Sequence, residues 1–184
     1  LSTTEFYNSD LYQEAFQRFD RVAISVGGIP EADIDQLVES LSAKDREKIC
    51  LIYGFQAEPT PLEQNNLLKL TALTKKYHDL KIGFMDHSDG SSEDAYNVSL
   101  IALGMGIDAI EKHITLDHSL EIEDYVSGLP ADRFIRFSEQ IRRYEKALGQ
   151  ASLDLTPLEL EYREKAVKLV VATRDISAGS LITS

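Results

Sequence analysis

Four short apolar runs alternate along the chain with segments whose apolar residues recur at helical spacing. The runs cover residues 21–26, 48–53, 81–85 and 108–114. Each is nearly continuous in apolar residues rather than alternating with polar ones, which is typical of parallel strands covered on both faces. We therefore predict four buried strands in a parallel sheet, joined by helices.

The segments around these runs predict five helices, defined by apolar residues three or four positions apart. In chain order the defining positions are Leu11, Ala15, Phe16 and Phe19; Ile34, Leu37, Val38 and Leu41 after Pro30; Leu67, Leu70 and Leu73; Val98, Ile101, Ala102 and Met105; and Phe134, Phe137, Ile141, Tyr144 and Leu148. Thr60-Pro61-Leu62-Glu63 has the form of a capping box and predicts the start of the third helix. Ser91-Ser92-Glu93-Asp94 opens the fourth helix, and Gly149 closes the fifth.

The spacing of the strands favours a (β/α)8 barrel, the TIM barrel. The runs start at residues 21, 48, 81 and 108, so successive starts are 27, 33 and 27 residues apart. A barrel of roughly 250 residues uses about 30 residues per unit, and four units make half a barrel. A doubly wound sheet fits the alternation almost as well. No glycine-rich phosphate fingerprint follows any strand, however, and Gly27-Gly28 alone is more typical of a tight turn.

Composition and charge exclude several classes of protein. With 184 residues, 43% of them hydrophobic, the chain can bury one sizeable core. A net charge of −12 argues against nucleic acid as a partner, because phosphate neutralisation needs clustered Lys and Arg. No apolar stretch approaches the roughly 20 residues of a membrane helix, and no signal peptide is visible. The single cysteine, Cys50, is expected to be buried and unpaired, which fits a reducing cytoplasm.

Two histidines close predicted strands and are the candidate metal ligands. His87 follows Asp86, and His113 follows Lys112, 26 residues further along. If the two strands are neighbours in a barrel, both imidazoles lie at its carboxyl-terminal face, where barrel active sites are built. Two converging neutral imidazoles beside carboxylates predict a divalent-metal site. The other histidines lie in polar, turn-like segments and are expected to be solvated: His78 and His118.

Both ends of the chain predict a longer parent protein. The chain starts with Leu1 rather than Met, and it stops shortly after a further strand-like run, 168–173, and a turn at Ser177-Ala178-Gly179. We expect residues 1–149 to form the second half of a barrel, and residues 150–184 to form a linker and the beginning of another domain. A lone half-barrel leaves two open sheet edges. We therefore expect this piece to be inactive alone and the protein to form a homodimer.

Four motifs, taken in order, resemble the sialic acid synthases and the related spore-coat polysaccharide enzymes. They are Val22-Ala23-Ile24-Ser25-Val26-Gly27; Leu51 through Pro59-Thr60-Pro61; Gly83-Phe84-Met85-Asp86-His87-Ser88; and Ile110-Glu111-Lys112-His113-Ile114-Thr115-Leu116-Asp117. Arg174-Asp175-Ile176-Ser177-Ala178-Gly179 then resembles the start of the family's antifreeze-like (SAF) domain. The resemblance runs from Thr3 to Leu181. It implies barrel strands 5–8 with the end of strand 4, followed by the linker to the SAF domain.

This resemblance implies a phosphoenolpyruvate-dependent sugar-acid synthase that acts in surface polysaccharide biosynthesis. Members condense phosphoenolpyruvate with an aldose such as N-acetylmannosamine, form a carbon–carbon bond and release phosphate. A divalent cation, Mn²⁺ or Mg²⁺, is held by the residues that match His87 and His113, and it polarises the aldehyde. Glu5, which follows Thr3-Thr4, matches the family's catalytic glutamate. The implied substrate-binding residues are Thr3, Asn8, Ser25 and Asp124.

The sequence departs from the family pattern mainly where the family binds phosphate. Met85 replaces a serine that is a phosphate ligand, and Glu58 replaces a tyrosine before Pro-Thr-Pro. The other replacements are Tyr53-Gly54 for a histidine–cysteine pair, Val26 for a threonine, and Ile122-Glu123 for Gly-Pro. Two further hypotheses therefore stay open beside the synthase: a metal-dependent aldol-type enzyme that uses another donor, and a non-catalytic sugar-binding or assembly module.

Overall fold

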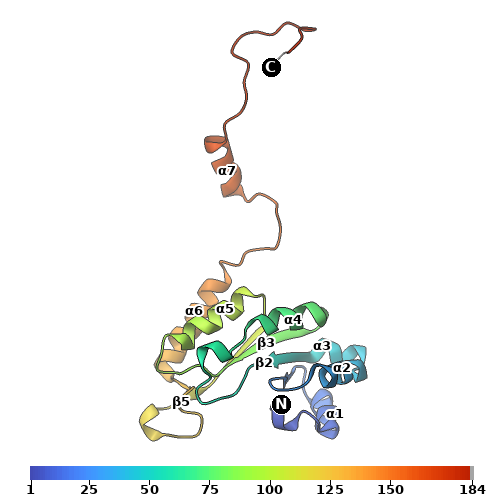
Figure 1. Ribbon diagram of the computed structural model, residues 1–184, viewed down its shortest axis with the longest axis vertical. Helices are drawn as coiled ribbons and strands as arrows, with labels where there is room; N and C mark the ends of the chain where they lie inside the picture. The colour runs from blue at the N-terminus through green and yellow to red at the C-terminus, as the bar shows by residue number, and fades with distance from the viewer. Residues whose placement is uncertain (183–184) are drawn as a thin grey trace. The chain divides into compact units, whose positions relative to one another are not determined.

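The computed structural model describes residues 1–182, and the chain divides into two compact units, residues 1–149 and 150–184. A four-stranded parallel sheet forms the centre of the first unit (Figure 1). Its strands, hydrogen-bonded in this order, are β1 (Val22–Ser25), β2 (Ile49–Tyr53), β3 (Lys81–Asp86) and β4 (Ala109–Lys112). The four predicted strands and their parallel pairing are confirmed.

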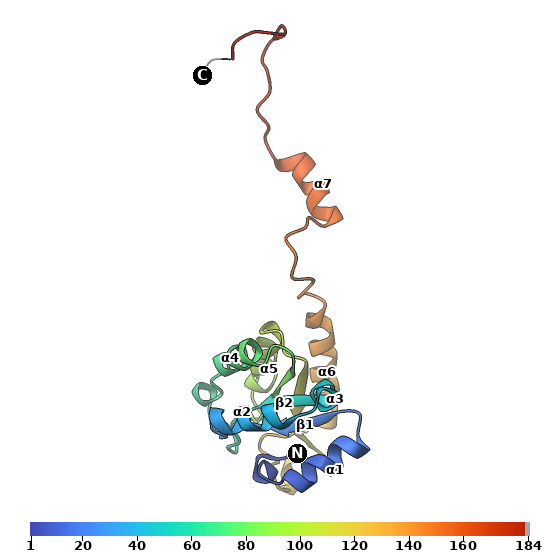
Figure 2. The same cartoon turned by 90° about the vertical axis from the view of Figure 1, so that its right-hand side faces the viewer.

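The sheet curls like part of a barrel (Figure 2). Its strand order follows the chain, without the switch point that a doubly wound sheet has. The backbone of Leu1 extends the sheet beyond β1, because the Ser25 N–H donates to the Leu1 carbonyl at 2.9 Å. A separate two-stranded parallel sheet pairs β5 (Ile114–Thr115) with β6 (Leu129–Pro130).

Helices follow each strand of the main sheet and cover one of its faces. Helices α4 and α5 pack on β3, and α6 packs on α5 (Figure 1). The helices of this unit are α1 (Ser9–Arg18), α2 (Glu31–Ser40), α3 (Ala43–Lys48), α4 (Leu68–Lys76), α5 (Asp94–Gly104) and α6 (Ala131–Glu145). Three single 3-10 turns are η1 (Thr3–Glu5), η2 (Leu62–Gln64) and η3 (His118–Leu120).

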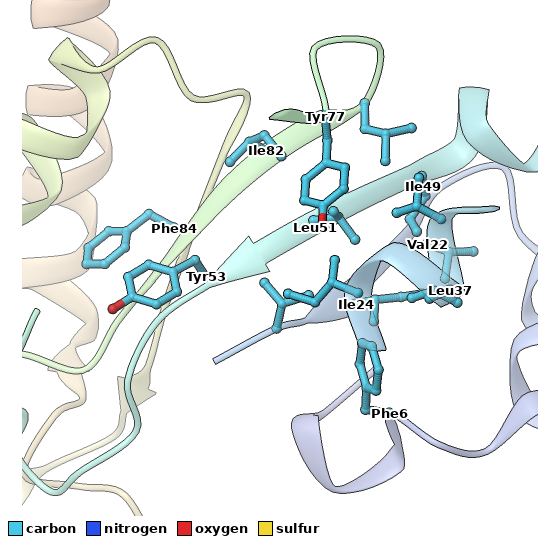
Figure 3. Close-up of a cluster of buried hydrophobic side chains, with 14 of the residues drawn as sticks. Phe6, Val22, Ile24, Leu37, Ile49, Leu51, Tyr53, Tyr77, Ile82 and Phe84 are labelled. Atoms are coloured by element: carbon cyan, nitrogen blue, oxygen red, sulfur yellow. The ribbon is translucent and has the colours of Figure 1, made fainter. Parts of the chain in front are cut away.

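The main hydrophobic core lies between the sheet and the helices, because alternate residues of a strand point to opposite faces. Its strand residues, several of which Figure 3 shows, are Val22, Ile24, Ile49, Leu51, Tyr53, Ile82 and Phe84. Each large apolar side chain buried in this way contributes roughly 1.5–3 kcal/mol relative to an exposed one. A smaller cluster, Ala95, Tyr96, Leu129 and Phe137, joins α5 to α6. A cavity lies on the opposite face of the sheet.

The third predicted helix begins later than its capping box indicates. The Thr60 hydroxyl donates to the Phe55 carbonyl, and the Thr60 N–H donates to the His87 carbonyl at 2.9 Å. The 3-10 turn η2 follows, and α4 starts only at Leu68. The predicted helix start at residues 60–63 is therefore wrong, since tertiary hydrogen bonds occupy the residue that was expected to cap the helix.

Four of the apolar side chains that define the predicted helices are largely exposed. Phe19, which follows α1, is 59% exposed, and Ile101 on α5 is 55% exposed. Tyr144 and Leu148, at and beyond the end of α6, are 45% and 49% exposed. Helical spacing predicts the helices, but the buried apolar stripe of each helix is narrower than the spacing suggests.

Within residues 150–182, the described part of the second unit, there is one helix, α7 (Pro157–Ala166). Its start is a capping box in which the Thr156 hydroxyl accepts from the Glu159 N–H and the Glu159 carboxylate accepts from the Thr156 N–H. The strand predicted at 168–173 is wrong, because this run is extended without strand pairing and its apolar side chains are exposed. Within the described part of the chain, no helix is both long and apolar enough to cross a membrane.

Candidate functional site

His87 and His113 lie beside each other at the carboxyl ends of neighbouring strands. His87 follows the last residue of β3, and His113 follows the last residue of β4. Their ring centroids are 4.7 Å apart, with an angle of 72° between the ring planes. The structure therefore brings together the two residues predicted to hold a metal.

Hydrogen bonds from other loops fix the backbone of both histidines. The Thr60 N–H and the Ser127 hydroxyl each donate to the His87 carbonyl at 2.9 Å. The Leu129 N–H donates to the His113 carbonyl at 2.9 Å. The loop after β2 and the segment before α6 thus hold the two imidazoles in place.

His87 is buried and uncharged near neutral pH. It is 1% exposed, and neither of its ring nitrogens has a hydrogen-bond partner among the described residues. Burial, and to a smaller extent the charge of His113, lowers the pKa of His87 from 6.5 to about 4. Leaving a polar group buried and unpaired costs roughly 1–3 kcal/mol. A neutral imidazole with free nitrogens is also the form that coordinates a metal ion.

A cavity of about 240 Å³ opens beside these rings, on the face of the sheet opposite the hydrophobic core. Its polar lining residues include Thr3, Ser25, Gln56, His87, Glu111 and His113. The hydroxyls of Thr3 and Ser25 are hydrogen-bonded at 2.6 Å, so two predicted substrate-binding residues share one wall. The sequence did not single out Gln56 or Glu111. Strand alternation could have found Glu111, which lies two residues before His113 and so on the same face.

The predicted catalytic glutamate lies outside the lining of this cavity. Glu5 is half-buried at the end of η1, and Asn8 Nδ2 donates to Glu5 Oε2 at 3.0 Å. Asn8 also caps α1, because its Oδ1 accepts from the Leu11 N–H at 3.2 Å. The structure thus joins Glu5 to Asn8, and it places neither side chain in the cavity wall.

Asp124 lies next to His113 and beside a second carboxyl group. Asp124 Oδ2 is 3.4 Å from His113 Nδ1. Glu58 is hydrogen-bonded to Asp124, and this bond, together with the charge of Asp124, raises the pKa of Glu58 above its usual 4.5. The predicted sugar-binding aspartate is therefore near the histidine pair, with Glu58 as its immediate neighbour.

The carboxylate of Asp86 lies outside the lining of the cavity, although Asp86 directly precedes His87. Asp86 Oδ2 accepts from the Ser99 hydroxyl of α5 at 2.6 Å, and Asp86 Oδ1 lies 3.4 Å from Lys112 Nζ. Asp86 and Lys112 therefore face the helix layer, while the next residue on each chain segment faces the cavity. The cause is strand alternation, which sends consecutive side chains to opposite faces.

The residues present fit a metal ion that takes two protein nitrogens and several ligands from water or substrate. Among residues 1–182, no group of three or more His, Cys, Asp or Glu side chains is arranged to hold a metal. The nitrogens that could ligate the metal are those of His87, which have no hydrogen-bond partner, and those of the neighbouring His113 ring. Imidazole nitrogens with open coordination positions suit divalent transition metals.

The other two histidines, His78 and His118, differ in how exposed their side chains are. His78 is exposed, as expected. His118 is half-buried, with its Nε2 2.8 Å from the Gly128 carbonyl oxygen, so the prediction that it is solvated is wrong. This bond closes the loop between β5 and β6.

Comparisons with known proteins show which proteins this chain is similar to. The pseudaminic acid synthase of Campylobacter jejuni is 30% identical over 160 residues, which cover 87% of this chain and 45% of that protein. The N-acetylneuraminate-9-phosphate synthase of Mus musculus is 27% identical over 176 residues, which cover 96% of this chain and 48% of that protein. The chain spans about half the length of the curated relatives it matches.

A similar fold occurs in the crystal structure of N-acetylneuraminic acid (sialic acid) synthetase from Leptospira borgpetersenii in complex with citrate. The TM-score is 0.77 and the identity 25%, over 90% of this chain and 57% of that chain. The resemblance to the sialic acid and spore-coat synthases is thereby confirmed. Residues 1–152 match the model of the NeuB family, and the chain therefore belongs to the NeuB family.

Proposed function

We propose that the protein containing this chain condenses phosphoenolpyruvate with an N-acetylmannosamine-type aldose, with the help of a divalent metal. The observation that carries the proposal is the pair His87 and His113, whose rings adjoin at the carboxyl ends of neighbouring strands. Pseudaminic and sialic acid synthases among the relatives support a sugar-acid product. In the proposed reaction a carbon–carbon bond forms between the donor's methylene carbon and the aldehyde carbon, and phosphate leaves as water adds.

His87 and His113 would hold the cation, Mn²⁺ or Mg²⁺. When bound, the cation supplies Lewis acidity at the aldehyde oxygen. The low pKa of His87, about 4, keeps this ligand unprotonated at neutral pH. Metal binding would also give one of its two unpartnered nitrogens a partner that the described chain does not offer.

The other predicted residues divide between the two substrates. The paired hydroxyls of Thr3 and Ser25 would donate to the oxygens of phosphoenolpyruvate. Asp124 would accept hydrogen bonds from the sugar hydroxyls. Glu5 would move a proton at the reacting centre, with Asn8 orienting its carboxylate through the 3.0 Å bond.

The decisive experiment measures Mn²⁺ binding and phosphate release in the intact protein with phosphoenolpyruvate and a panel of aldoses. His87→Ala and His113→Ala should each weaken Mn²⁺ binding by about 100-fold or more and stop phosphate release. His78→Ala, which removes an exposed imidazole, is the matched control and should leave both unchanged. Unchanged Mn²⁺ affinity in both site variants would refute the proposal.

A second candidate keeps the metal and Glu5 but uses another keto-acid donor. Met85 motivates it, because this half-buried side chain lines the cavity where a hydrogen-bond donor for phosphate is expected. Pyruvate would then react with the aldose while phosphoenolpyruvate releases no phosphate. Phosphate release with any aldose in the panel excludes this candidate. Sugar binding without metal-dependent turnover would instead favour a non-catalytic module.

The rest of the proposed protein follows from the family. The described sheet would form barrel strands 5–8, and residues 150–184 would form the linker and the beginning of an SAF domain. We further propose a cytoplasmic homodimer that binds small-molecule substrates and neither nucleic acid nor membrane. Sedimentation of the intact protein tests the dimer, with a monomer as the contradicting result.

A further inference from the structure

Asp86 and Lys112 are the last residues of β3 and β4, and they face each other across the ladder. Their Cα atoms are register partners in the parallel pairing of the two strands. The next residue on each chain segment is a histidine of the candidate metal site. The separation of the two imidazoles therefore depends on how these two strand ends are held.

The pair is sealed in the layer between the sheet and α5. The side chain of Asp86 is 0% exposed and that of Lys112 is 1% exposed, although the backbone of β4 lies at the edge of the described sheet. Lys112 Nζ is 3.4 Å from Asp86 Oδ1 and donates to the Ser88 carbonyl at 3.4 Å. Lys112 thus reaches from β4 to the residues on both sides of His87.

Asp86 is held from three directions. Besides Lys112, the Ser99 hydroxyl of α5 donates to its Oδ2 at 2.6 Å, and the Ser88 N–H donates to its Oδ1 at 2.8 Å. The last of these bonds closes the backbone tightly around His87. A carboxylate with this many fixed donors has one geometry rather than several, and it links α5, β3 and β4.

Fold stability alone is a weak reason for such a pair. Desolvating two charges costs several kcal/mol per ion, and well-packed neutral residues of similar size often serve the fold as well or better. What a buried pair supplies better than apolar packing is a fixed register and a fixed distance, and metal ligands must be held to within a few tenths of an ångström.

We infer that Asp86 and Lys112 are positioning residues, which clamp the ends of β3 and β4 and so hold the His87 and His113 rings at metal-binding separation. This inference rests on the proposed metal-assisted function. It concerns residues on the face of the sheet that no substrate reaches, so the two residues act only through the histidines.

The test compares single and double variants of the intact protein. Asp86→Asn and Lys112→Met should each weaken Mn²⁺ binding by about 10- to 100-fold, the usual effect of removing an outer partner of a metal ligand. Each also leaves one buried charge unpaired and should lower the thermal unfolding midpoint. The double variant, Asp86→Asn with Lys112→Met, removes both charges, so the midpoint should recover while the Mn²⁺ affinity stays at least about tenfold weaker.

If Asp86 and Lys112 only stabilise the fold, the double variant should give the opposite result. Mn²⁺ affinity that recovers together with the unfolding midpoint would overturn the inference. Ser99→Ala is the milder variant if the double variant does not fold: it removes one bond to Asp86, and unchanged Mn²⁺ affinity would then overturn the inference equally. Arg46→Met, which breaks a pair with Asp79 at the surface, is the control and should leave Mn²⁺ binding unchanged.

A second readout separates this inference from the proposed function. In metal-free protein labelled with ¹³C at histidine Cε1, the Asp86 and Lys112 variants should shift the ring signals of His87 and His113, and Arg46→Met should not. If the intact protein binds no Mn²⁺ but these signals shift, the proposed function fails and the positioning role stands. If Mn²⁺ binds and neither its affinity nor the ring signals change in the variants, the positioning role fails alone.

Discussion

The two sides of the cavity satisfy their polar groups in different ways. On the histidine side, both nitrogens of His87 are buried without a partner in the described chain. On the hydroxyl side, Thr3 and Ser25 bond to each other at 2.6 Å, and the neighbouring Met85 has no strong hydrogen-bonding group. The polar groups of the histidine side are free to bind an external ligand, whereas those of the hydroxyl side have hydrogen-bond partners within the protein.

This difference bears on which of the two proposed binding functions, for a metal ion or for phosphate, has more support. Unpaired buried nitrogens cost stability, so a site that keeps them has a reason beyond folding. The hydroxyl pair has no such cost and would bind an anion only by giving up its internal bond. The comparison thus supports metal binding more strongly than phosphate binding. One prediction tests the histidine side, one tests the hydroxyl side, and a third tests the carboxyl pair Glu58 and Asp124.

The largest effect is expected on the histidine side, in the pH dependence of stability without metal. The folded pKa of His87 is about 4, while an unfolded histidine titrates near 6.5. Between these values the unfolded chain takes up a proton that the folded protein does not. The free energy of unfolding should therefore fall as the pH drops from about 6.5 to 4, by roughly 3 kcal/mol at most from this group, and level off below.

Urea unfolding at several pH values in the presence of a chelator measures this effect. His87→Leu is the matched variant, because it removes the titrating ring and keeps an apolar side chain in its place. The difference in unfolding free energy between parent and variant should change across this window and stay constant above pH 7. A constant difference at every pH would show that His87 is accessible to protons in the folded protein.

The strands and the convergence of the histidines could be predicted because both depend on local pattern. Continuous apolar runs mark parallel strands, and parallel strands end at one edge, so residues that close neighbouring runs must meet. The face on which each residue lies also follows from alternation, and alternation applied strictly would have sent Asp86 away from His87.

Other features depend on contacts that local pattern does not contain. Thr60 was predicted to cap a helix, but its N–H donates a hydrogen bond to the carbonyl of His87, 27 residues further along. Glu5 follows the expected motif, yet its carboxylate bonds to Asn8 rather than lining the cavity. In both cases a long-range or neighbouring partner competes for the polar group, and its identity becomes known only when the chain is folded.

The hydroxyl side is tested by restoring a donor at residue 85. Met85→Ser should lower the KM for phosphoenolpyruvate by about tenfold, because one hydrogen bond to a charged group contributes roughly 1.5 kcal/mol or more. Steady-state phosphate release at fixed aldose measures this change. Met85→Ala, which creates the same space without a hydroxyl, is the control and should give no such gain. An equal KM for both variants would show that no oxygen of phosphoenolpyruvate lies near residue 85.

The smallest effect is expected at Glu58, which lies beside Asp124, the neighbour of His113. Its carboxyl group shares a hydrogen bond with Asp124, and this bond raises the pKa of Glu58. The bond needs one proton, so it is present at acid pH and is lost as the pH rises through the raised pKa, after which two carboxylates repel each other beside His113.

Glu58→Gln replaces the shared proton with an amide that donates to Asp124 at every pH. Because this change removes the repulsion between two exposed carboxylates, the KM for the aldose at pH 8 should fall by about two- to fivefold. The pH profile of this KM should also flatten on the acid side. Glu123→Gln, which removes a neighbouring charge without the bond, is the control. If it lowers the KM as much as Glu58→Gln does, net charge rather than the bond to Asp124 governs how the sugar side of the cavity binds.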